Sequence, residues 1–518
     1  DNMNYQFQIE ENELWWGGTA SSGTSNPFCN KSSFEADFRR LAENQTMPMF
    51  LSNHGRIIWS DEPFAVKIAD GKFNIEGENV TITKMGDTLK EAYIAAQKAH
   101  FPANGKKLND EFFLVPQYNT WMQFTYLPTQ EGVLNYAKDI LNNGFPPGIL
   151  IIDEGWHTRY GTWEFDLSRF PDPKGMVDKL HEMGFKVMLW VVPYFCADGK
   201  DFISRMRKDL NPETYNETFL RTDKGDVAII HWWNGYSAIL DMTKKCDRDY
   251  LDGKLKGLMK DYGVDGFKFD GGTLENYTES TMINGAPDKS ATPAERNIAW
   301  NDFGLKYEFH EYKDTFKGGG KNAIQRMQDR LHSWDTFGIN TLLPNALLQG
   351  LLGHPFICPD MVGGGEWTCR ELKTPVDEEL FVRMAQCSAL FPMMQFSWAP
   401  WEAVSSDHLN MICDMAHLHQ SVSETILKLV RSAEQSGEPI LRNLEYNYPN
   451  QGYGKITDQF MLGEDILVAP VVTKGTTRRD VVLPSGKWEE QNTKEVYDGE
   501  KTVTLDAPLD TLLWFKRV

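Results

Sequence analysis

The chain has 518 residues, enough for roughly two to four domains and a large hydrophobic core. It carries 53 Lys and Arg against 73 Asp and Glu, a formal net charge of −20. This negative excess argues against a nucleic-acid partner, because nucleic-acid binding depends on clustered Lys and Arg. We also expect no membrane span, since no stretch approaches the roughly 18 consecutive apolar residues that a transmembrane helix needs.

The seven cysteines are scattered, without a C-x-x-C pair or a spacing typical of metal ligands. We therefore expect neither a disulfide framework nor a metal site. Several Asn-x-Ser/Thr sequences favour a secreted or periplasmic location, although so many also arise by chance in a long chain, and the compartment stays open. They begin at Asn30, Asn44, Asn79, Asn216 and Asn276.

Residues 1–105 consist of short alternating apolar and polar runs separated by turn residues, as in "GRIIWSDEPFAVKIADGKFNIEGENVTITK". Such alternation is typical of antiparallel strands, and it predicts an N-terminal β-sandwich. Residues 434–518 alternate in the same way after a long helix that ends near Arg431, and they predict a small C-terminal all-β domain.

Between these parts, residues 106–433 repeat a strand followed by an amphipathic helix, for example "GILIIDEGW", then "PKGMVDKLHEMG", then "FKVMLWVVPYF". Repeated units of this kind force parallel pairing through right-handed crossovers. They predict a (β/α)8 barrel, with an open doubly wound sheet as the alternative. Two long insertions, 196–243 and 273–292, interrupt the repeat, and the first is aromatic enough to wall the mouth of a barrel.

Polar residues recur where the predicted barrel strands end. The carboxyl ends of barrel strands share one mouth, where active sites are built, so this recurrence favours the barrel over the open sheet. The residues are Asp153, Glu154, Asp270, Arg326, Asp329, Asp360, Gln395 and Ser397.

Asp270 ends the buried strand "VDGFKFD" and is followed by Gly271 and Gly272, which we expect to leave open space around it. An ionised carboxylate beside a cleft is what a catalytic nucleophile or the stabiliser of an oxocarbenium ion requires. Lys268, two residues earlier, points to the same side of the strand and would keep Asp270 charged. A helix cap or a salt bridge with Lys268 is the structural alternative.

A glycosidase needs a second carboxyl group that is protonated and donates to the leaving oxygen. The stretch "QRMQDRLHSWDTFGINTLLPNALLQG" offers two candidates, Asp329 and Asp335. Asp329 falls inside a predicted strand, where an ion pair is the expected role. Asp335 follows Trp334, and an aromatic neighbour that excludes water raises the pKa of a carboxyl group. We therefore predict Asp335 as the acid/base residue.

Several of these stretches together carry a family resemblance: "DGFKFDGG", the Trp-Asp loop before "NTLLPNALLQGLLGHPFICPDMVGG", and "FVRMAQCSALFPMMQF". The chain resembles glycoside hydrolase family 31 over nearly its whole length. The resemblance implies a retaining α-glycosidase built from a β-sandwich, a (β/α)8 barrel and distal β domains, working without a cofactor or metal. It implies Asp270 as the nucleophile, Asp335 as the acid/base residue, and sugar-contacting roles for Asp153, Arg326 and Asp360.

The resemblance is greatest to an α-galactosidase branch of that family. Where family glucosidases have Arg-x-His, this chain has Gln395-Phe396-Ser397, so we expect a sugar other than glucose. Trp233 in "HWWNG" is expected to stack on the sugar, and Glu154, Trp190, Lys268, Gln395 and Ser397 complete the predicted substrate-binding set. The sequence thus predicts an exo-acting α-galactosidase that cleaves oligosaccharides. It leaves the oligomeric state open.

Other functions remain as alternatives. An α-glucosidase or another α-glycosidase of the same family differs only in the sugar accepted. A non-catalytic carbohydrate-binding protein on the same fold is disfavoured by the two intact carboxylates. A metal-dependent barrel enzyme lacks support, because His417 and His419 lie in the helix after the barrel, and residues two apart on a helix do not face one another.

Overall fold

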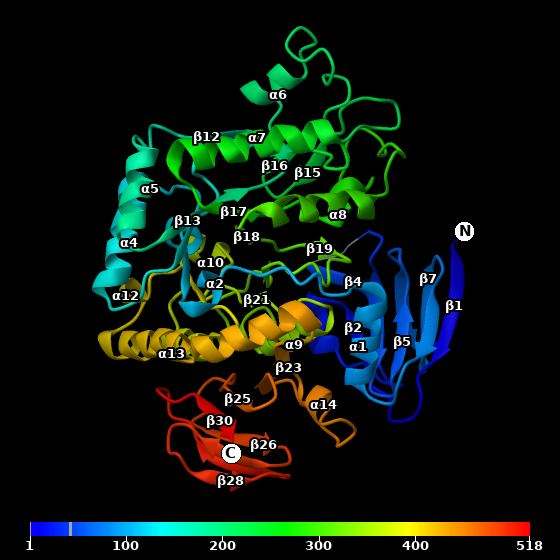
Figure 1. Cartoon of the computed structure of the whole chain (residues 1–518), viewed down its shortest axis with the longest axis vertical. Coiled ribbons are helices and arrows are strands. Elements are labelled where there is room, and N and C mark those ends of the chain that lie inside the picture. Colours follow the sequence, from blue (N-terminus) through cyan, green and yellow to red (C-terminus); the bar gives the residue numbers. More distant parts are fainter. Residues whose placement is uncertain (1, 41–43) are drawn as a thin grey trace.

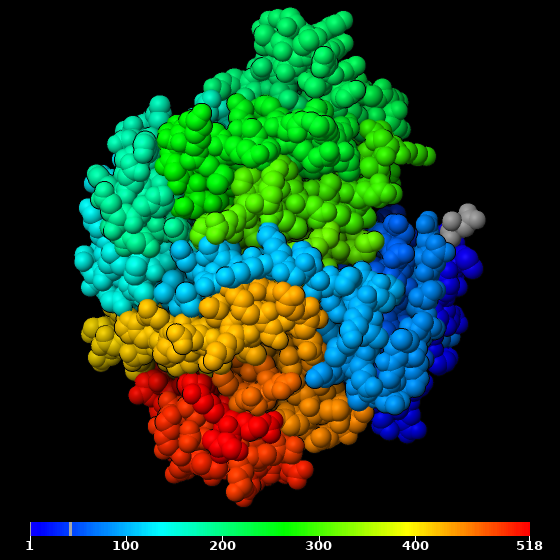
Figure 2. All heavy atoms as spheres, in the orientation of Figure 1, coloured from blue at the N-terminus to red at the C-terminus, as the bar shows by residue number. Residues whose placement is uncertain are grey.

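The structure, a computed structural model of the chain, describes residues 2–40 and 44–518. An N-terminal pair of β-sheets, a central barrel and a C-terminal β domain follow one another from blue through green to red in Figure 1. The space-filling view shows the outer two parts packed against the central one as a continuous body (Figure 2). Among the helices of the described residues, none is both long and apolar enough to cross a membrane.

Within the described residues, eight short parallel strands form the barrel. They are β9 (Gln117–Asn119), β10 (Ile149–Ile152), β13 (Lys186–Val191), β17 (Gly266–Phe269), β18 (Phe309–Glu311), β20 (Gln325–Arg326), β21 (Ile357–Cys358) and β22 (Gln395–Phe396). Six pair in the order β18-β17-β13-β10-β9-β22, and β20 pairs with β21. Parallel bridges from Tyr312 to Gln325 and from Val362 to Phe396 join the two groups. The closed ring confirms the predicted barrel and excludes the open sheet.

Helices follow seven of these strands along the described chain. They are α4 (Gln130–Asn142), α5 (Pro173–Glu182), α7 (Lys245–Tyr262), α8 (Pro293–Phe303), α9 (Leu342–Leu351), α11 (Glu378–Ala389) and α13 (Ser406–Ser436). Thr292 caps α8 by accepting a hydrogen bond from the amide of Glu295, whose side chain accepts one from the Thr292 amide. Helix α9 is buried along its whole length, because it lies between the barrel and both flanking domains.

The N-terminal part is a sandwich of two antiparallel sheets, as predicted. One sheet contains β1 (Met3–Gln8), β3 (Phe34–Asp37), β6 (Ala65–Ala69) and β7 (Lys72–Gly77), and the other contains β2 (Trp15–Thr19), β4 (Gln45–Ser52), β5 (Arg56–Trp59) and β8 (Thr81–Lys84). Aromatic side chains, among them Trp15, Phe50 and Phe73, fill the space between them. Helix α1 (Leu89–His100) then leads toward the barrel.

Strand β18 is the exception among the barrel strands, because no helix follows it in residues 312–324, all of which the structure describes. Instead the chain leaves the barrel and forms β19 (Thr315–Phe316), which pairs in parallel with Gln45 and Thr46 at the start of β4. A segment of the barrel thus completes a sheet of the N-terminal sandwich. The sequence gives no indication of this exchange.

The C-terminal part is a β domain, as predicted, with a six-stranded and a two-stranded sheet and one short helix, α14 (Leu444–Asn447). The larger contains β23 (Leu441–Arg442), β24 (Phe460–Leu462), β25 (Ile466–Ala469), β27 (Lys487–Glu490), β28 (Val496–Asp498) and β30 (Leu513–Arg517), and the smaller contains β26 (Arg478–Leu483) and β29 (Lys501–Asp506). The helix before it, α13, runs to Ser436, five residues beyond the predicted end, and Gly437 ends it in a left-handed conformation with φ 71°. Buried Arg383 of α11 donates to the carbonyl oxygen of Ala507 at 2.8 Å, which ties this domain to the barrel.

Several short elements surround the mouth of the barrel. After β9 the chain forms α3 (Trp121–Phe124). The first insertion forms α6 (Lys200–Arg205), β15 (Ile230–Trp232) and β16 (Gly235–Ile239), and β16 pairs with β14 (Tyr194–Phe195) just before the insertion. The tip of the β15–β16 hairpin carries Trp233 and Asn234. Helix α10 (Thr368–Glu371) follows β21.

Candidate active site

A cavity of about 260 Å³ lies where the barrel strands end. Carboxylates, cations and aromatic rings make up most of its wall, which brings together side chains that are far apart in the sequence. The lining residues are Trp121, Tyr126, Asp153, Glu154, Trp190, Trp233, Lys268, Asp270, Lys313, Asp314, Arg326, Asp329, Glu366 and Trp367.

Asp270 directly follows β17 and is held by two hydrogen bonds. Its Oδ2 accepts from the indole Nε1 of Trp190 at 3.0 Å, and its Oδ1 accepts from the amide of Gly271 at 3.0 Å. Burial alone would raise the pKa of Asp270, but the charges of Lys313 and Lys268, together with the Trp190 hydrogen bond, lower it. Asp270 is therefore an anchored, ionised carboxylate at neutral pH.

The two glycines after Asp270 do not leave open space, contrary to the expectation from the sequence. Both have positive φ, 64° for Gly271 and 62° for Gly272. A Cβ on Gly271 would lie 2.5 Å from the hydroxyl oxygen of Tyr194, and one on Gly272 would lie 2.3 Å from the ring of Trp300. The glycines are required because the chain turns sharply beneath two aromatic rings, which fix the position of Asp270.

Lys268 and Asp153 form a buried ion pair beside Asp270. The Nζ of Lys268 lies 2.7 Å from Oδ2 of Asp153, which also accepts from Nδ2 of Asn119 at 2.9 Å. Lys268 thus pairs directly with Asp153 and acts on Asp270 only through its charge. The pair keeps one cation and one carboxylate at the base of the cavity.

Lys313 and Asp314 also line the cavity, although they were not predicted from the sequence. They follow β18 closely and enter the cavity where the chain turns away to form β19. Lys313 Nζ lies 3.3 Å from Oδ2 of Asp329. Burial raises the pKa of Asp314 to about 7, with Lys313 opposing the shift and the charge of Asp270 adding to it. A charged pair so soon after a strand end is the signal that sequence reasoning missed.

Asp329 lies in a loop, not inside a strand as expected, because β20 ends at Arg326. Its Oδ1 lies 3.6 Å from Nη1 of Arg326, and Arg326 also binds Asp360 Oδ1 through Nη2 at 2.7 Å. Burial alone would raise the pKa of Asp329, but the charges of Lys313 and Arg326 lower it. Arg326 reaches the cavity wall, whereas Asp360 lies behind it as the partner of Arg326 and does not line it.

Glu154 differs from the other carboxylates of the cavity. Its Oε1 accepts hydrogen bonds from the hydroxyl of Tyr160 at 3.0 Å and from Nδ2 of Asn234 at 2.9 Å. Burial, and then the charge of Asp153, raise the pKa of Glu154 to about 8. Glu154 is therefore protonated at neutral pH, while Asp270 is ionised.

Aromatic rings surround the carboxylates. Trp121, Trp190 and Trp233 line the cavity together with Tyr126 and Trp367, and the Trp233 side chain remains 50% exposed. Trp233 reaches the cavity because the inserted β15–β16 hairpin carries it there, in agreement with the role expected for the first insertion.

The structure does not bring Asp335, Gln395 and Ser397 to the cavity. Asp335 is exposed, and its Oδ1 accepts from the hydroxyl of Ser333 and the amide of Phe337. Gln395 and Ser397 are fully buried: Gln395 donates to Glu311, and the Ser397 Oγ accepts from the amide of Met122 at 2.7 Å. Their side chains are engaged by the protein, so they are not available to a ligand in this cavity.

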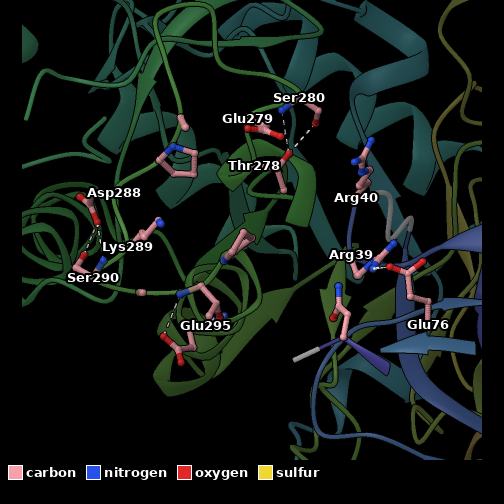
Figure 3. Close-up of a pocket in the computed structure, with 16 residues that line it drawn as sticks. Arg39, Arg40, Glu76, Thr278, Glu279, Ser280, Asp288, Lys289, Ser290 and Glu295 are labelled. Carbon is pink, nitrogen blue, oxygen red and sulfur yellow. Dashed lines mark hydrogen bonds and ion pairs between the residues drawn. The ribbon is translucent and has the colours of Figure 1, made fainter. Parts of the chain in front are cut away.

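A larger hollow of about 930 Å³ lies between the N-terminal sandwich and residues 278–295 (Figure 3). Some of its charged groups bind other residues of the hollow. Arg39 donates to Glu76 at 3.2 Å, and the Glu295 side chain accepts from the amide of Thr292 at 3.1 Å. Because these groups do not converge on one point, we assign the candidate active site to the smaller cavity.

An ionised carboxylate and further carboxyl groups among aromatic rings, at the carboxyl ends of a (β/α)8 barrel, define the class of barrel glycoside hydrolases. Residues 115–406 match the TIM-barrel domain of glycosyl hydrolases family 31, and residues 437–517 match the C-terminal domain of that family. The chain belongs to glycoside hydrolase family 31, as the sequence motifs predict.

Similar proteins agree with this membership. The chain is 32% identical over 410 residues to the myogenesis-regulating glycosidase of Mus musculus, across 77% of this chain and 55% of that protein. It is 25% identical over 412 residues to alpha-glucosidase 2 of Bacillus thermoamyloliquefaciens, across 74% of this chain and 50% of that protein. The chain spans about half the length of these two curated relatives. A solved dextranase of Flavobacterium johnsoniae in complex with glucose has the same fold, with a TM-score of 0.82, 20% identity and coverage of 100% of this chain and 66% of that one.

Proposed function

We propose that this chain is a retaining exo-acting α-glycosidase in which Asp270 is the nucleophile and Asp329 is the acid/base residue. The observation that carries the proposal is that both carboxylates line one small cavity, where Lys313 acts on both. Names of relatives, a glycosidase from mouse and an alpha-glucosidase from Bacillus, support a glycoside as the substrate.

In the first step, Asp270 attacks the anomeric carbon while the acid/base residue donates a proton to the leaving oxygen. In the second step, the acid/base residue takes a proton from water, and that water releases the sugar from Asp270. Lys313, Lys268 and Trp190 favour the ionised form of Asp270, which a nucleophile requires.

Asp329 replaces Asp335 as the proposed acid/base residue because an acid must reach the glycosidic oxygen, and Asp335 lies on the surface outside the cavity. Glu154 is the alternative acid, since its pKa of about 8 leaves it protonated at neutral pH, whereas Lys313 and Arg326 lower the pKa of Asp329. As the acid, Asp329 must therefore take up a proton when the substrate binds. We favour Asp329 because Glu154 already accepts hydrogen bonds from Tyr160 and from Asn234 of the inserted hairpin. These bonds suit Glu154 to a supporting role, in which it holds the hairpin in place.

We propose α-linked galactose as the terminal sugar. Trp233 supplies an exposed aromatic face, which suits the C–H patch that an axial 4-hydroxyl leaves on galactose, and the sequence resembles an α-galactosidase branch. Gln395 and Ser397 no longer support this choice directly, because they do not line the cavity.

The test compares four variants on p-nitrophenyl α-galactoside, α-glucoside and α-xyloside. We expect Asp270→Ala to lose roughly 10⁴-fold or more in kcat, and azide to restore part of it by forming the β-azide. Asp329→Ala should give the α-azide and lose most on substrates with poor leaving groups. Asp335→Ala, the matched control six residues away, should keep near wild-type rates.

Each outcome separates the alternatives. An α-azide product from Glu154→Ala, but not from Asp329→Ala, would assign the acid/base role to Glu154. Normal rates in Asp270→Ala would contradict the mechanism itself. Faster cleavage of the α-glucoside than of the α-galactoside by wild type would contradict only the sugar.

A further inference from the structure

Asp314 lines the candidate active-site cavity, but no step of the proposed mechanism uses it. It lies in the segment that follows β18, where the chain turns out of the barrel toward β19. Its neighbour Lys313 pairs with Asp329 at 3.3 Å and acts on Asp314 only through its charge. In residues 2–40 and 44–518 we find no ion pair that involves the Asp314 carboxyl group.

The two carboxyl oxygens of Asp314 differ in what they bind. Oδ1 accepts a hydrogen bond from the backbone amide of Asn44 at 2.6 Å, and the amide of Thr315 donates to the carbonyl oxygen of Asn44 at 3.1 Å. The N-terminal sandwich thus holds both the side chain of Asp314 and the backbone next to it. Oδ2 has no hydrogen-bond partner among the described residues, and the partly exposed side chain lines the cavity. Oδ2 is therefore the oxygen that a ligand in the cavity can reach.

This oxygen suits a hydroxyl group better than a charged ligand. Burial raises the pKa of Asp314 to about 7, so the protonated and the ionised forms are both populated at neutral pH. A hydroxyl group donates and accepts hydrogen bonds, so it can pair with either form. An ammonium group could pair only with the ionised form, and the charge of Lys313 would oppose its approach. Because Asn44 fixes the carboxyl group before a ligand arrives, little side-chain freedom is lost on binding.

We propose that Asp314 is a specificity-determining residue, whose Oδ2 forms a hydrogen bond with one hydroxyl group of the sugar in the cavity. This rests on the proposed function, which supplies the sugar. A site built to hydrogen-bond a particular hydroxyl group discriminates against a sugar that lacks it, because the protein group then loses its partner. The alternative is that Asp314 only connects the barrel to the sandwich through Asn44.

The test measures binding without turnover, by isothermal titration in the Asp270→Asn background. The ligands are p-nitrophenyl α-galactoside and its four analogues that each lack one hydroxyl group. We expect Asp314→Ala to weaken binding of the parent galactoside about tenfold. For one analogue this loss should shrink to less than about twofold, because the hydroxyl group that Asp314 binds is already absent. The other three analogues should show the same loss as the parent.

Asp265→Ala is the matched control. Asp265 is also a partly buried carboxylate that accepts a backbone hydrogen bond, from the amide of Val187 at 2.8 Å, and it does not line the cavity. Its replacement should leave the binding of all five ligands unchanged. Thermal unfolding shows whether each variant folds. If Asp314→Ala does not fold, Asp314→Asn takes its place, because its amide oxygen can keep the bond to Asn44. Its loss, about threefold with the parent, should likewise disappear for one analogue.

An equal loss with all five ligands would overturn the proposal, because Asp314 would then only connect the two domains. A variant that binds every ligand as tightly as the protein with Asp314 would overturn it too. The corresponding glucosides test the same contact if the sugar assignment fails, and absence of binding in both series would contradict both proposals. If wild type cleaves no glycoside and yet the loss depends on one hydroxyl group, the catalytic function fails while the role of Asp314 stands. If wild type cleaves the galactoside and the loss is equal throughout, only the role of Asp314 fails.

Discussion

Asp270 is surrounded by more positive charge than its sequence neighbours indicate. The sequence identifies Lys268, which lies on the same strand, but Lys313 has the larger effect on the pKa of Asp270 and follows β18, the next strand of the barrel. It was missed because β18 has only three residues, Phe-His-Glu, without the apolar run that marks β10 or β13. Site residues could be predicted where they follow an apolar strand such as β10 or β13, but not where they follow the short, polar strand β18.

The sequence favoured Asp335 over Asp329 for the site, and the structure instead places Asp329 at the cavity, for a different reason. Both lie in the loop after β20, six residues apart, and the sequence distinguishes them only by the neighbour Trp334. In the structure, Trp334 donates from its indole nitrogen to Asp377 at 2.8 Å. Asp335 itself is exposed, so Trp334 does not exclude water from its carboxyl group. The path of an irregular loop depends on tertiary contacts of this kind, which no local pattern reveals.

Glu154 makes the free energy of unfolding depend on pH. Its pKa rises from an ordinary 4.5 to about 8 on folding, so the folded state holds a proton that the unfolded state loses between these values. The contribution of Glu154 to the free energy of unfolding is fully present below about pH 4.5. It is lost as the pH rises toward 8, by up to about 1.4 kcal/mol per pH unit. Glu154→Gln should lack this loss. Urea unfolding at pH 5, 6.5 and 8 checks it, and parallel curves for the two proteins would contradict it.

At the scale of single elements, the turn after α3 determines where Tyr126 stands. The amide of Leu127 donates to the carbonyl oxygen of Phe124 at 3.1 Å, and Thr125 between them has φ 52° and ψ −124°. These angles belong to the first central position of a type II′ turn, which glycine normally occupies. A threonine there is strained, and the strain lies beside Tyr126, whose ring lines the cavity.

We expect Thr125→Gly to stabilise the fold by about 0.5–1 kcal/mol, because relief of strain exceeds the added freedom of glycine in the unfolded chain. The same change should weaken the binding of p-nitrophenyl α-galactoside to an Asp270→Asn variant, since Tyr126, which lines the cavity, is then held less firmly. Thermal unfolding and titration measure the two effects. Asp70→Gly is the control, because Asp70 also has positive φ, 53°, in the distant β6–β7 turn, where aspartate is well tolerated. Lower stability with unchanged binding would contradict the idea of stored strain.

At the scale of the whole molecule, the N-terminal sandwich supports the active site directly. Gln45, at the start of β4, is fully buried. Its Nε2 lies within hydrogen-bond distance of the carbonyl oxygens of Lys313 (2.9 Å) and Arg326 (3.0 Å) and of Gln325 Oε1 (3.1 Å). The amide of Asn44 donates to Asp314. The sequence predicted both the sandwich and the barrel, but the contacts between them involve no periodic pattern and were not predictable.

Gln45→Ala should therefore lower the free energy of unfolding by about 1–3 kcal/mol. It should also lower kcat about tenfold or more, because the backbone of Lys313 and Arg326 is no longer held; replacing a buried polar residue far from the active site should not have this second effect. Gln459→Ala is the matched control, because Gln459 is equally buried and bonds the backbone of Val482 in the C-terminal domain. We expect it to lose stability without losing kcat. Steady-state kinetics at a temperature where both variants stay folded separates the two, and equal kcat values would show Gln45 to be only structural.

The pairing of β19 with β4 also bears on how the chain is made. Gln45 and Thr46 leave the ribosome early, but their partners Thr315 and Phe316 emerge about 270 residues later, roughly 15–50 seconds at ordinary rates of synthesis. During that interval this end of β4 is an open strand edge, the kind of surface that recruits other chains. The nascent sandwich therefore needs protection until β19 has been synthesised. The loop that carries Lys313 acquires its final position only when β19 pairs with β4.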